Sequence, residues 1–284
     1  MSPRNHIQDS LSHVLDTCVC PFCYGKLKNS GDDILCHECD FTFPVLNGIP
    51  VFISKNDMSH KNRKLSSLYD KSTIKHHGSY KSCGYSGKND YLSRLNIIKR
   101  WIDFENINGK KIIDIGCGTG LMTEQLVQRN EVWGIDISLG LLGFAEKKGL
   151  KTSLASAAKL PYAHNTFDMA ICIGVIPYYN NPSDIFSELF RVTRPGGRIV
   201  VSSTADSFLI RFVRFIKNIS GGFSQLAHLY TTAEIEGFLT LRGAKILDAC
   251  TGYKENVFSV IDKPPPFAYR LLSRANAVLA ETAK

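Results

Sequence analysis

Apolar and polar positions alternate in blocks from residue 92 onward, a pattern typical of strands connected by helices. An amphipathic helix is predicted up to about Phe104, and short apolar runs then alternate with segments of helical period. The predicted strands are Lys111–Ile115, Glu131–Ile135, Thr152–Ala155, Met169–Ile173 and Arg198–Ser203, and the helices between them are Thr123–Arg129, Leu139–Lys148 and Ser183–Val192. This order indicates an α/β domain whose parallel sheet is covered by helices on both faces.

The pattern after residue 203 predicts two more helices and two more strands. The helices are Ser207–Ile219 and Thr232–Leu241, the β runs are Lys245–Thr251 and Asn256–Asp262, and a C-terminal helix is predicted from Phe267 after three prolines. The helix over 207–219 carries a cation at every third position of an aromatic, apolar segment. Such a helix could pack as a lid over the acceptor pocket, dock on a membrane surface or contact RNA phosphates, and the sequence does not decide among these three roles.

The first 54 residues form a separate unit, with short β-like runs on either side of an Asn47-Gly48 turn signal. The polar stretch that follows reads as a linker or a mobile cap. The predicted organisation is a small domain over residues 1–54, a basic linker or cap over 55–91, an α/β domain over 92–263 and a C-terminal helix over 264–284.

Composition excludes several protein classes. The 284 residues are 44% hydrophobic and 21% charged, as in globular proteins and unlike disordered chains or coiled coils. No apolar run has the roughly 20 residues of a membrane span, and the first 15 residues lack the order of a signal peptide, so we expect a cytoplasmic protein. The net charge of +8 equals the excess of 11 basic over 3 acidic residues within 55–100, because the other residues sum to zero. This local charge favours an anionic partner, of which RNA is one example.

Four of the nine cysteines occur as two C-x2-C pairs, Cys20/Cys23 and Cys36/Cys39. Two such pairs can place four thiolates around one ion, and a closed set of sulfur ligands selects structural Zn²⁺. A domain of about 50 residues also needs such a cross-link to be stable. Incidental buried thiols and a redox-active pair are the alternatives.

The segment around these cysteines resembles the zinc-ribbon proteins that activate tRNA and protein methyltransferases as separate subunits. It is also similar to the ribbon that begins the rRNA guanine-N1 methyltransferases, where the last ligand is commonly histidine. The matching residues are Cys20, Cys23, Gly25, Leu27, Cys36, Cys39, Pro44, Gly48, Ile49 and Pro50. The resemblance implies a recognition or docking module that could hold a protein partner.

A glycine-rich turn follows the strand over 111–115, with Gly116, Gly118 and Gly120 at alternate positions. Glycines let the backbone turn tightly and approach a ligand, and Asp136, at the end of the next strand, suits ribose hydroxyls. Asp114 precedes the loop, where a carboxylate repels a pyrophosphate and attracts a cation. The expected cofactor therefore carries a positive charge and a ribose, as S-adenosylmethionine does.

Residues 114–120 resemble the first motif of the class I S-adenosylmethionine-dependent methyltransferases, and Asp136 matches that family's ribose acid. Leu160-Pro161-Tyr162, Asn165–Asp168 and Arg191–Gly197 resemble later motifs of the family, and the two final β runs fit its antiparallel hairpin. The resemblance implies a Rossmann-like sheet of seven strands over about 92–262. Ser156 stands where many relatives have an acid that contacts the adenine. The implied cofactor contacts are Asp114, Gly116, Cys117, Gly118, Gly120, Asp136, Ile137, Ser156, Ala157 and Ile173.

Two residues are candidates for the acceptor side. Tyr178 follows the fourth strand, which faces the methyl group in this family, and Ile176–Tyr179 lacks the tetrad of amino-methylating nucleic-acid enzymes. His228 precedes the helix capped by Thr231 or Thr232 and could act as a general base if the acceptor is a hydroxyl. Ordinary packing is the alternative for both residues.

Three functions follow from these features. The first is methylation of a small-molecule acceptor by in-line transfer, and an anionic acceptor would suit the 55–100 segment. The second is methylation of an rRNA or tRNA base, with the ribbon and the basic segment recognising RNA. The third is a noncatalytic adaptor that binds the cofactor and docks a protein through the ribbon.

Overall fold

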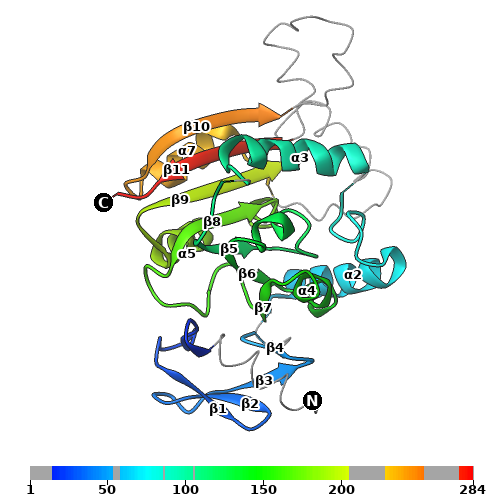
Figure 1. Cartoon of the computed structure of the whole chain (residues 1–284), viewed down its shortest axis with the longest axis vertical. Helices are drawn as coiled ribbons and strands as arrows, with labels where there is room; N and C mark the ends of the chain where they lie inside the picture. The colour runs from blue at the N-terminus through cyan, green and yellow to red at the C-terminus, as the bar shows by residue number, and fades with distance from the viewer. Residues whose placement is uncertain are drawn as a thin grey trace, which may run out of the picture.

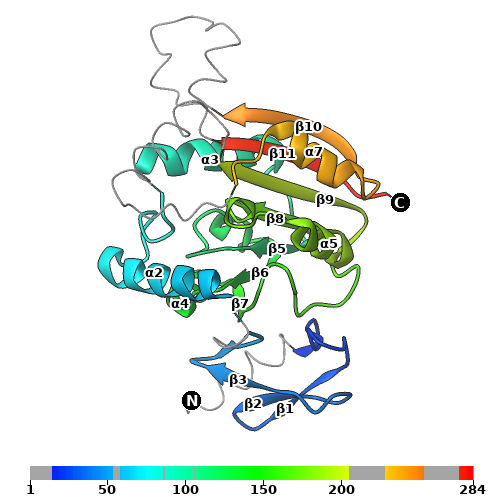
Figure 2. The same cartoon turned by 180° about the vertical axis from the view of Figure 1, so that it is seen from behind.

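The computed structural model describes residues 15–53, 58–85, 87–104, 106–204, 228–252 and 275–283 of the chain. These residues form a small sheet at the N-terminal end and a larger sheet with helices on both faces (Figures 1 and 2). None of the helices in these ranges is long and apolar enough to cross a membrane.

The small sheet has four antiparallel strands in sequence order: β1 (Leu27–Ser30), β2 (Asp33–Cys36), β3 (Thr42–Leu46) and β4 (Ile49–Pro50). The predicted Asn-Gly turn is confirmed, because Asn47 and Gly48 join β3 to β4 with φ values of 53° and 83°. Two consecutive residues with positive φ match the right-handed twist of a hairpin. We call residues 15–53 the N-terminal domain.

The large sheet has seven strands in the order β10-β11-β9-β8-β5-β6-β7, which confirms the predicted fold class. The five strands β5 (Lys111–Ile115), β6 (Glu131–Asp136), β7 (Lys151–Leu154), β8 (Phe167–Ile173) and β9 (Thr193–Thr204) pair in parallel. The strands β10 (Lys245–Gly252) and β11 (Ala275–Glu281) are antiparallel. The order reverses at β5 and β8, and an open α/β sheet binds ligands at the carboxyl ends of strands at such a point.

Helices cover both faces of this sheet because successive buried residues of a strand point to opposite sides. Ile113 packs with the residues of α5 (Ser183–Val192) and α7 (Thr232–Thr240), whereas Ile112 packs with those of α3 (Lys88–Trp101) and α4 (Leu139–Glu146). The predicted helix over 123–129 is reduced to a 3₁₀ turn, η1 (Glu124–Leu126), and a second one, η2 (Ile176–Tyr178), follows β8.

The flanking segments contain elements that the pattern did not predict. The expected linker or cap over 55–91 contains a 17-residue helix, α2 (His60–His76), whose N-cap Ser59 accepts a hydrogen bond from Asn62 N. The expected C-terminal helix over 264–284 was wrong where it can be compared, because residues 275–281 form β11 between β9 and β10. The sheet therefore extends past the predicted boundary at residue 263. The predicted helix over 207–219 and the predicted strand over 256–262 lie outside the described residues.

Candidate functional site

The glycine-rich loop lies at the carboxyl end of β5, where the strand order reverses. Gly116, Gly118 and Gly120 have φ values of 74°, 56° and 76°, which side chains rarely adopt. A Cβ at Gly116 would collide with Val175 Cγ2, so this position also lacks space for a side chain. The backbone amides of Gly116 and Cys117 donate to Ile135 O, at 2.8 and 2.9 Å, which holds the loop against β6. Glycine is therefore required by both conformation and packing.

Asp136, at the end of β6, has its carboxylate fixed by two backbone amides. Gly118 N donates to Oδ2 at 3.0 Å and Ser138 N donates to Oδ1 at 2.9 Å. Burial raises the pKa of this carboxyl to about 6. The hydrogen bonds from the backbone amides of Ser138, Gly118 and Ile137 lower the pKa and oppose part of this shift. Each carboxylate oxygen keeps a further lone pair, which suits the two hydroxyls of a ribose.

Asp114 lies beneath the loop and not on its surface. Its side chain is 2% exposed and Oδ2 accepts a hydrogen bond from Thr123 Oγ1 at 2.7 Å. Burial raises the pKa of this carboxyl to about 7. Asp114 can therefore act on a ligand only through the loop, and its carboxyl is partly protonated near neutral pH.

Helix α2 lies across the carboxyl ends of the strands and adds residues that sequence reasoning missed. Asp70 Oδ1 accepts hydrogen bonds from Ser138 Oγ at 2.6 Å and from Gly140 N at 3.1 Å, at the start of α4. The hydroxyl of Tyr69 is 2.5 Å from that of Tyr178, and Cys83, beyond the helix, has its sulfur 3.3 Å from Thr119 Oγ1. No motif marks these residues, because their role depends on where the helix packs.

Tyr178 is the last residue of η2, which follows β8, and its hydroxyl contacts that of Tyr69 in α2. Burial raises the pKa of both Tyr69 and Tyr178 above the ordinary value. Both phenols are therefore neutral at physiological pH and can donate hydrogen bonds.

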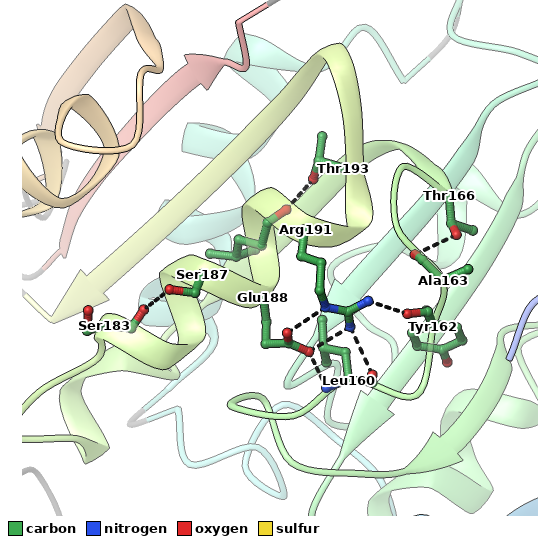
Figure 3. Close-up of polar contacts among 10 residues, drawn as sticks. Leu160, Tyr162, Ala163, Thr166, Ser183, Ser187, Glu188, Arg191 and Thr193 are labelled. Carbon is green, nitrogen blue, oxygen red and sulfur yellow. Dashed lines mark hydrogen bonds and ion pairs between the residues drawn. The ribbon is translucent and has the colours of Figure 1, made fainter. Parts of the chain in front are cut away.

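The predicted adenine contacts belong to the segment 154–162, which α5 holds from one side (Figure 3). Glu188 Oε2 accepts a hydrogen bond from Leu160 N at 2.5 Å, and Arg191 donates to Tyr162 O at 2.6 Å and to Leu160 O at 3.0 Å. Arg191 also pairs with Glu188, with Nε 2.6 Å from Oε1. Breaking a buried pair of this kind costs about 3–5 kcal/mol, so the pair fixes the backbone of the segment.

Within this segment, the side chain of Ser156 is partly exposed and that of Ala157 is buried. Ser156 Oγ accepts a hydrogen bond from Ala158 N at 3.2 Å, and Ala157 is 4% exposed. Ile173, the last residue of β8, is 8% exposed. These three residues and Ile137 lie on strand ends or on the loops after them, as the resemblance implies.

His228 lies beside η2, with its backbone amide donating to Pro177 O at 3.2 Å. Its Nε2 is 3.1 Å from Glu234 Oε1, and nearly half of its side chain is exposed. Thr231 is the N-cap of α7 and forms a capping box with Glu234, which fixes the carboxylate that faces the imidazole. The Glu234 carboxylate therefore orients the imidazole of His228.

The four cysteines of the two C-x2-C pairs come together in the N-terminal domain, with their sulfurs within 4.8 Å of one another. The Sγ atoms of Cys20 and Cys39 are 3.7 Å apart, and those of Cys23 and Cys36 are 3.4 Å apart. Sulfur ligands at zinc distance in a tetrahedron are about 3.8 Å apart. The donor set therefore fits a zinc ion.

The two cysteine turns have the same backbone structure. Cys20 N donates to Gly25 O and Cys36 N donates to Phe41 O, both at 2.9 Å. The residue after the second cysteine has a positive φ in each turn, 59° at Tyr24 and 54° at Asp40. The repeated geometry directs all four sulfurs to one point.

The N-terminal domain also contacts the segment 154–162, and the centre of its Tyr24 ring lies 4.8 Å from the guanidinium of Arg191 in α5. Val19 N donates to Pro161 O at 3.0 Å, and Phe52 N donates to Leu154 O at 2.8 Å. Lys159 Nζ lies 4.2 Å from the centre of the Phe22 ring, between the first two cysteines. The cysteine cluster and the predicted adenine site are thus connected through the main chain.

Comparison with known proteins agrees with this geometry. Residues 113–201 match the family model described as a methyltransferase domain. The chain is 32% identical over 115 residues to a ubiquinone biosynthesis O-methyltransferase of Pseudomonas fluorescens (strain SBW25), covering 36% of this chain and 48% of that relative. It is 31% identical over 157 residues to a demethylmenaquinone methyltransferase of Geobacillus sp. (strain WCH70), covering 50% and 57%. The chain thus spans about half the length of these relatives.

A solved structure shows the same fold. Magnesium protoporphyrin IX methyltransferase from Synechocystis PCC 6803, with bound S-adenosylhomocysteine, superposes with a TM-score of 0.56 and 18% identity, over 78% of this chain and 100% of that one. The sheet order and the family match agree: the large sheet has the fold of this methyltransferase structure, and residues 113–201 match a methyltransferase domain.

Proposed function

We propose that this protein is an S-adenosylmethionine-dependent methyltransferase that acts on a small-molecule acceptor. The observation that carries the proposal is the carboxylate of Asp136, fixed by Gly118 N and Ser138 N beside a loop of glycines with positive φ. This arrangement offers acceptors for ribose hydroxyls and an open backbone for a close ligand.

S-adenosylmethionine, when bound, supplies a methyl group on a positively charged sulfur. Asp136 would hold the ribose, and Asp114 would contribute negative charge beneath the loop near the positive groups of the cofactor. Tyr69 and Tyr178 are neutral because of their raised pKa values; one of the two hydroxyls donates to the other, and the remaining hydrogen would be donated to an acceptor oxygen. Such groups orient the acceptor for in-line attack, which supplies much of the rate for this reaction.

The acceptor that we favour has a hydroxyl group. The two curated relatives are named for ubiquinone biosynthesis and for demethylmenaquinone, which supports a quinone-type or other aromatic small molecule. Methylation of a hydroxyl releases one proton, and His228, oriented by Glu234, would take it. The acceptor oxygen forms the new bond to carbon as the carbon–sulfur bond breaks.

The N-terminal domain would hold one structural Zn²⁺ through Cys20, Cys23, Cys36 and Cys39. The proposal is supported by the repeated cysteine turns and by the separation of the sulfurs. Four thiolates leave no open position on the ion, so the metal would stabilise the domain and take no part in methyl transfer.

Calorimetry with S-adenosylhomocysteine, followed by turnover of hydroxylated quinone precursors, tests the proposal. We expect micromolar binding of the cofactor product and turnover that is insensitive to salt. RNA binding that falls steeply with salt, with turnover only on RNA, would instead favour base methylation. Cofactor binding without turnover of any acceptor would favour an adaptor that docks a protein partner.

A further inference from the structure

The start of α4 connects the candidate cofactor site with α2. Ser138 is the N-cap of α4, and its Oγ accepts a hydrogen bond from Leu141 N at 3.2 Å. The backbone amide of the same residue donates to Asp136 Oδ1 at 2.9 Å. Ser138 is buried, and its amide is one of the two that fix the Asp136 carboxylate. A change in the position of Ser138 would therefore change the orientation of that carboxylate.

Asp70 of α2 completes this helix N-terminus. The first turn of α4 has no acidic residue of its own, and Asp70 Oδ1 accepts hydrogen bonds from Ser138 Oγ at 2.6 Å and from Gly140 N at 3.1 Å. The second bond satisfies an amide that has no partner within the helix, and the negative charge is favourable beside the positive end of the helix dipole. A carboxylate only accepts hydrogen bonds, so the Ser138 hydroxyl donates to Asp70 and is held in one orientation.

A glycine near the start of α4 allows α2 to approach this closely. A Cβ at Gly140 would lie 3.1 Å from Asp70 Oδ1 and 3.6 Å from Asp70 Cα. At Gly143, in the next turn of the same helix, a Cβ would have no described neighbour within 4 Å. Glycine is unfavourable inside a helix, and the contact with Asp70 is a reason for it at position 140 that does not apply at 143.

Helix α2 lies beside α4 and also contacts η2 (Figures 1 and 2). Lys61 Nζ donates to Tyr178 O at 2.6 Å, and the hydroxyls of Tyr69 and Tyr178 are 2.5 Å apart. Tyr69 and Asp70 are adjacent, so one turn of α2 contacts both η2 and the start of α4. These contacts fix α2, and with it the Asp70 carboxylate, against the residues that surround the candidate cofactor site.

We propose that Asp70 is a positioning residue of the cofactor site, which holds Ser138, and through it the Asp136 carboxylate, in the orientation that binds the ribose. The inference rests on the proposed function and adds to it a residue that acts from a different helix. The connection has two steps, from Asp70 to the Ser138 hydroxyl and from the Ser138 amide to Asp136. The alternative is that Asp70 only anchors α2 to the domain.

Calorimetry with S-adenosylhomocysteine at pH 8 tests the inference. Asp70→Ala should bind about tenfold more weakly, because it loses both hydrogen bonds to the start of α4. Asp70→Asn keeps a side-chain oxygen that can accept them, so it should retain most of the affinity. Gly140→Ala should also weaken binding, because its Cβ would displace the Asp70 carboxylate. Gly143→Ala is the matched control, with the same substitution in open space on the same helix, and it should bind as the wild type does.

The pH dependence of binding separates positioning of Asp136 from anchoring of α2. Burial is the main cause of the raised pKa of Asp136, and the negative charge of Asp70 raises this pKa further. In both Asp70 variants the loss of affinity on acidification should therefore begin at a lower pH than in the wild type. Loss of an anchor alone would weaken binding without moving this onset.

Other titratable groups do not obscure this comparison. Besides Asp70, those that face Asp136 in the described structure are Tyr69, Cys83, Asp114, Cys117, Tyr178 and Tyr179. Burial raises the pKa of each of these thiols and phenols, so they stay neutral between pH 5 and pH 8. Asp114 titrates in this range but is present in every variant, so a difference from the wild type reports the charge of Asp70.

Three outcomes would overturn the inference. One is wild-type affinity in Asp70→Ala, and another is equal weakening in Gly140→Ala and Gly143→Ala, which would trace the loss to the stability of α4. The third is weaker binding with an unchanged acid onset, which would leave Asp70 as an anchor of α2. If melting curves show that Asp70→Ala is unfolded, Asp70→Asn and the glycine pair decide the question. Failure of the wild type to bind S-adenosylhomocysteine would count instead against the proposed function.

Discussion

Removing the metal from the four-cysteine site is expected to weaken S-adenosylhomocysteine binding, although the two proposed sites share no residue. The connection is the segment 154–162, which carries the predicted adenine contacts Ser156 and Ala157. The N-terminal domain supports this segment through Val19 N to Pro161 O and Phe52 N to Leu154 O. A domain of this size loses its structure without its cross-link, and both hydrogen bonds would be lost with it.

The size of the effect follows from these two hydrogen bonds. Each contributes about 0.5–1.5 kcal/mol, so together they favour the ordered segment by about 1–3 kcal/mol, or roughly 5- to 150-fold in affinity. The Glu188–Arg191 pair still holds Leu160 and Tyr162 from the side of α5. We therefore expect the lower part of this range, a dissociation constant about tenfold higher.

Calorimetry should compare metal-loaded protein with protein stripped by a chelator and with Cys36→Ser. Cys250→Ser, a cysteine of β10 outside the cluster, is the control for the substitution itself. Because coupling between two sites is reciprocal, saturating S-adenosylhomocysteine should raise the affinity for zinc by the same factor. An unchanged dissociation constant, in stripped protein whose methyltransferase domain is still folded, would refute the reasoning.

Four further predictions concern the candidate active site. Asp136→Ala should abolish measurable S-adenosylhomocysteine binding by calorimetry, and unchanged affinity would mean that the ligand is a different one. Acidification from pH 8 to pH 5 should weaken that binding by up to about tenfold per pH unit below about 6, where Asp136 becomes protonated. The melting temperature of the ligand-free protein should be higher at pH 5 than at pH 8. In the folded state Asp114 and Asp136 have pKa values of about 7 and about 6, so they bind protons at pH values where the unfolded chain has released them. This stabilisation is lost as the pH rises through these values. His228→Ala should lower kcat about 100-fold with cofactor affinity unchanged, and a normal kcat would remove His228 from catalysis.

The sequence predicted the parts of the fold that local chemistry determines. Glycines with positive φ, the Asn47-Gly48 turn and the spacing of the cysteines each constrain the chain within a few residues, and the structure has them as expected. The parallel strands were also predictable, since they are buried on both faces and therefore continuously apolar.

The parts that failed depend on distant contacts. Among the residues of α2 whose burial the structure describes, Leu65, Ser66 and Thr73 are buried, so the helix has little apolar periodicity. The contacts of Tyr69 and Asp70 with Tyr178 and Ser138 were therefore not predictable from the sequence. Residues 275–281 are rich in good helix formers, yet they form a strand because β9 and β10 pair with them on both sides. Tertiary pairing overrides propensity in such a position.

The place of β11 also sets an order of assembly for the sheet. In the described structure, β10 pairs only with β11, and β11 joins it to β9. Residues 245–252 leave the ribosome before their partner does, so β10 has no native partner until residues 275–281 are made. These late, long-range pairings favour slow completion of the sheet, and the exposed edge of β9 is the surface most open to mispairing during synthesis.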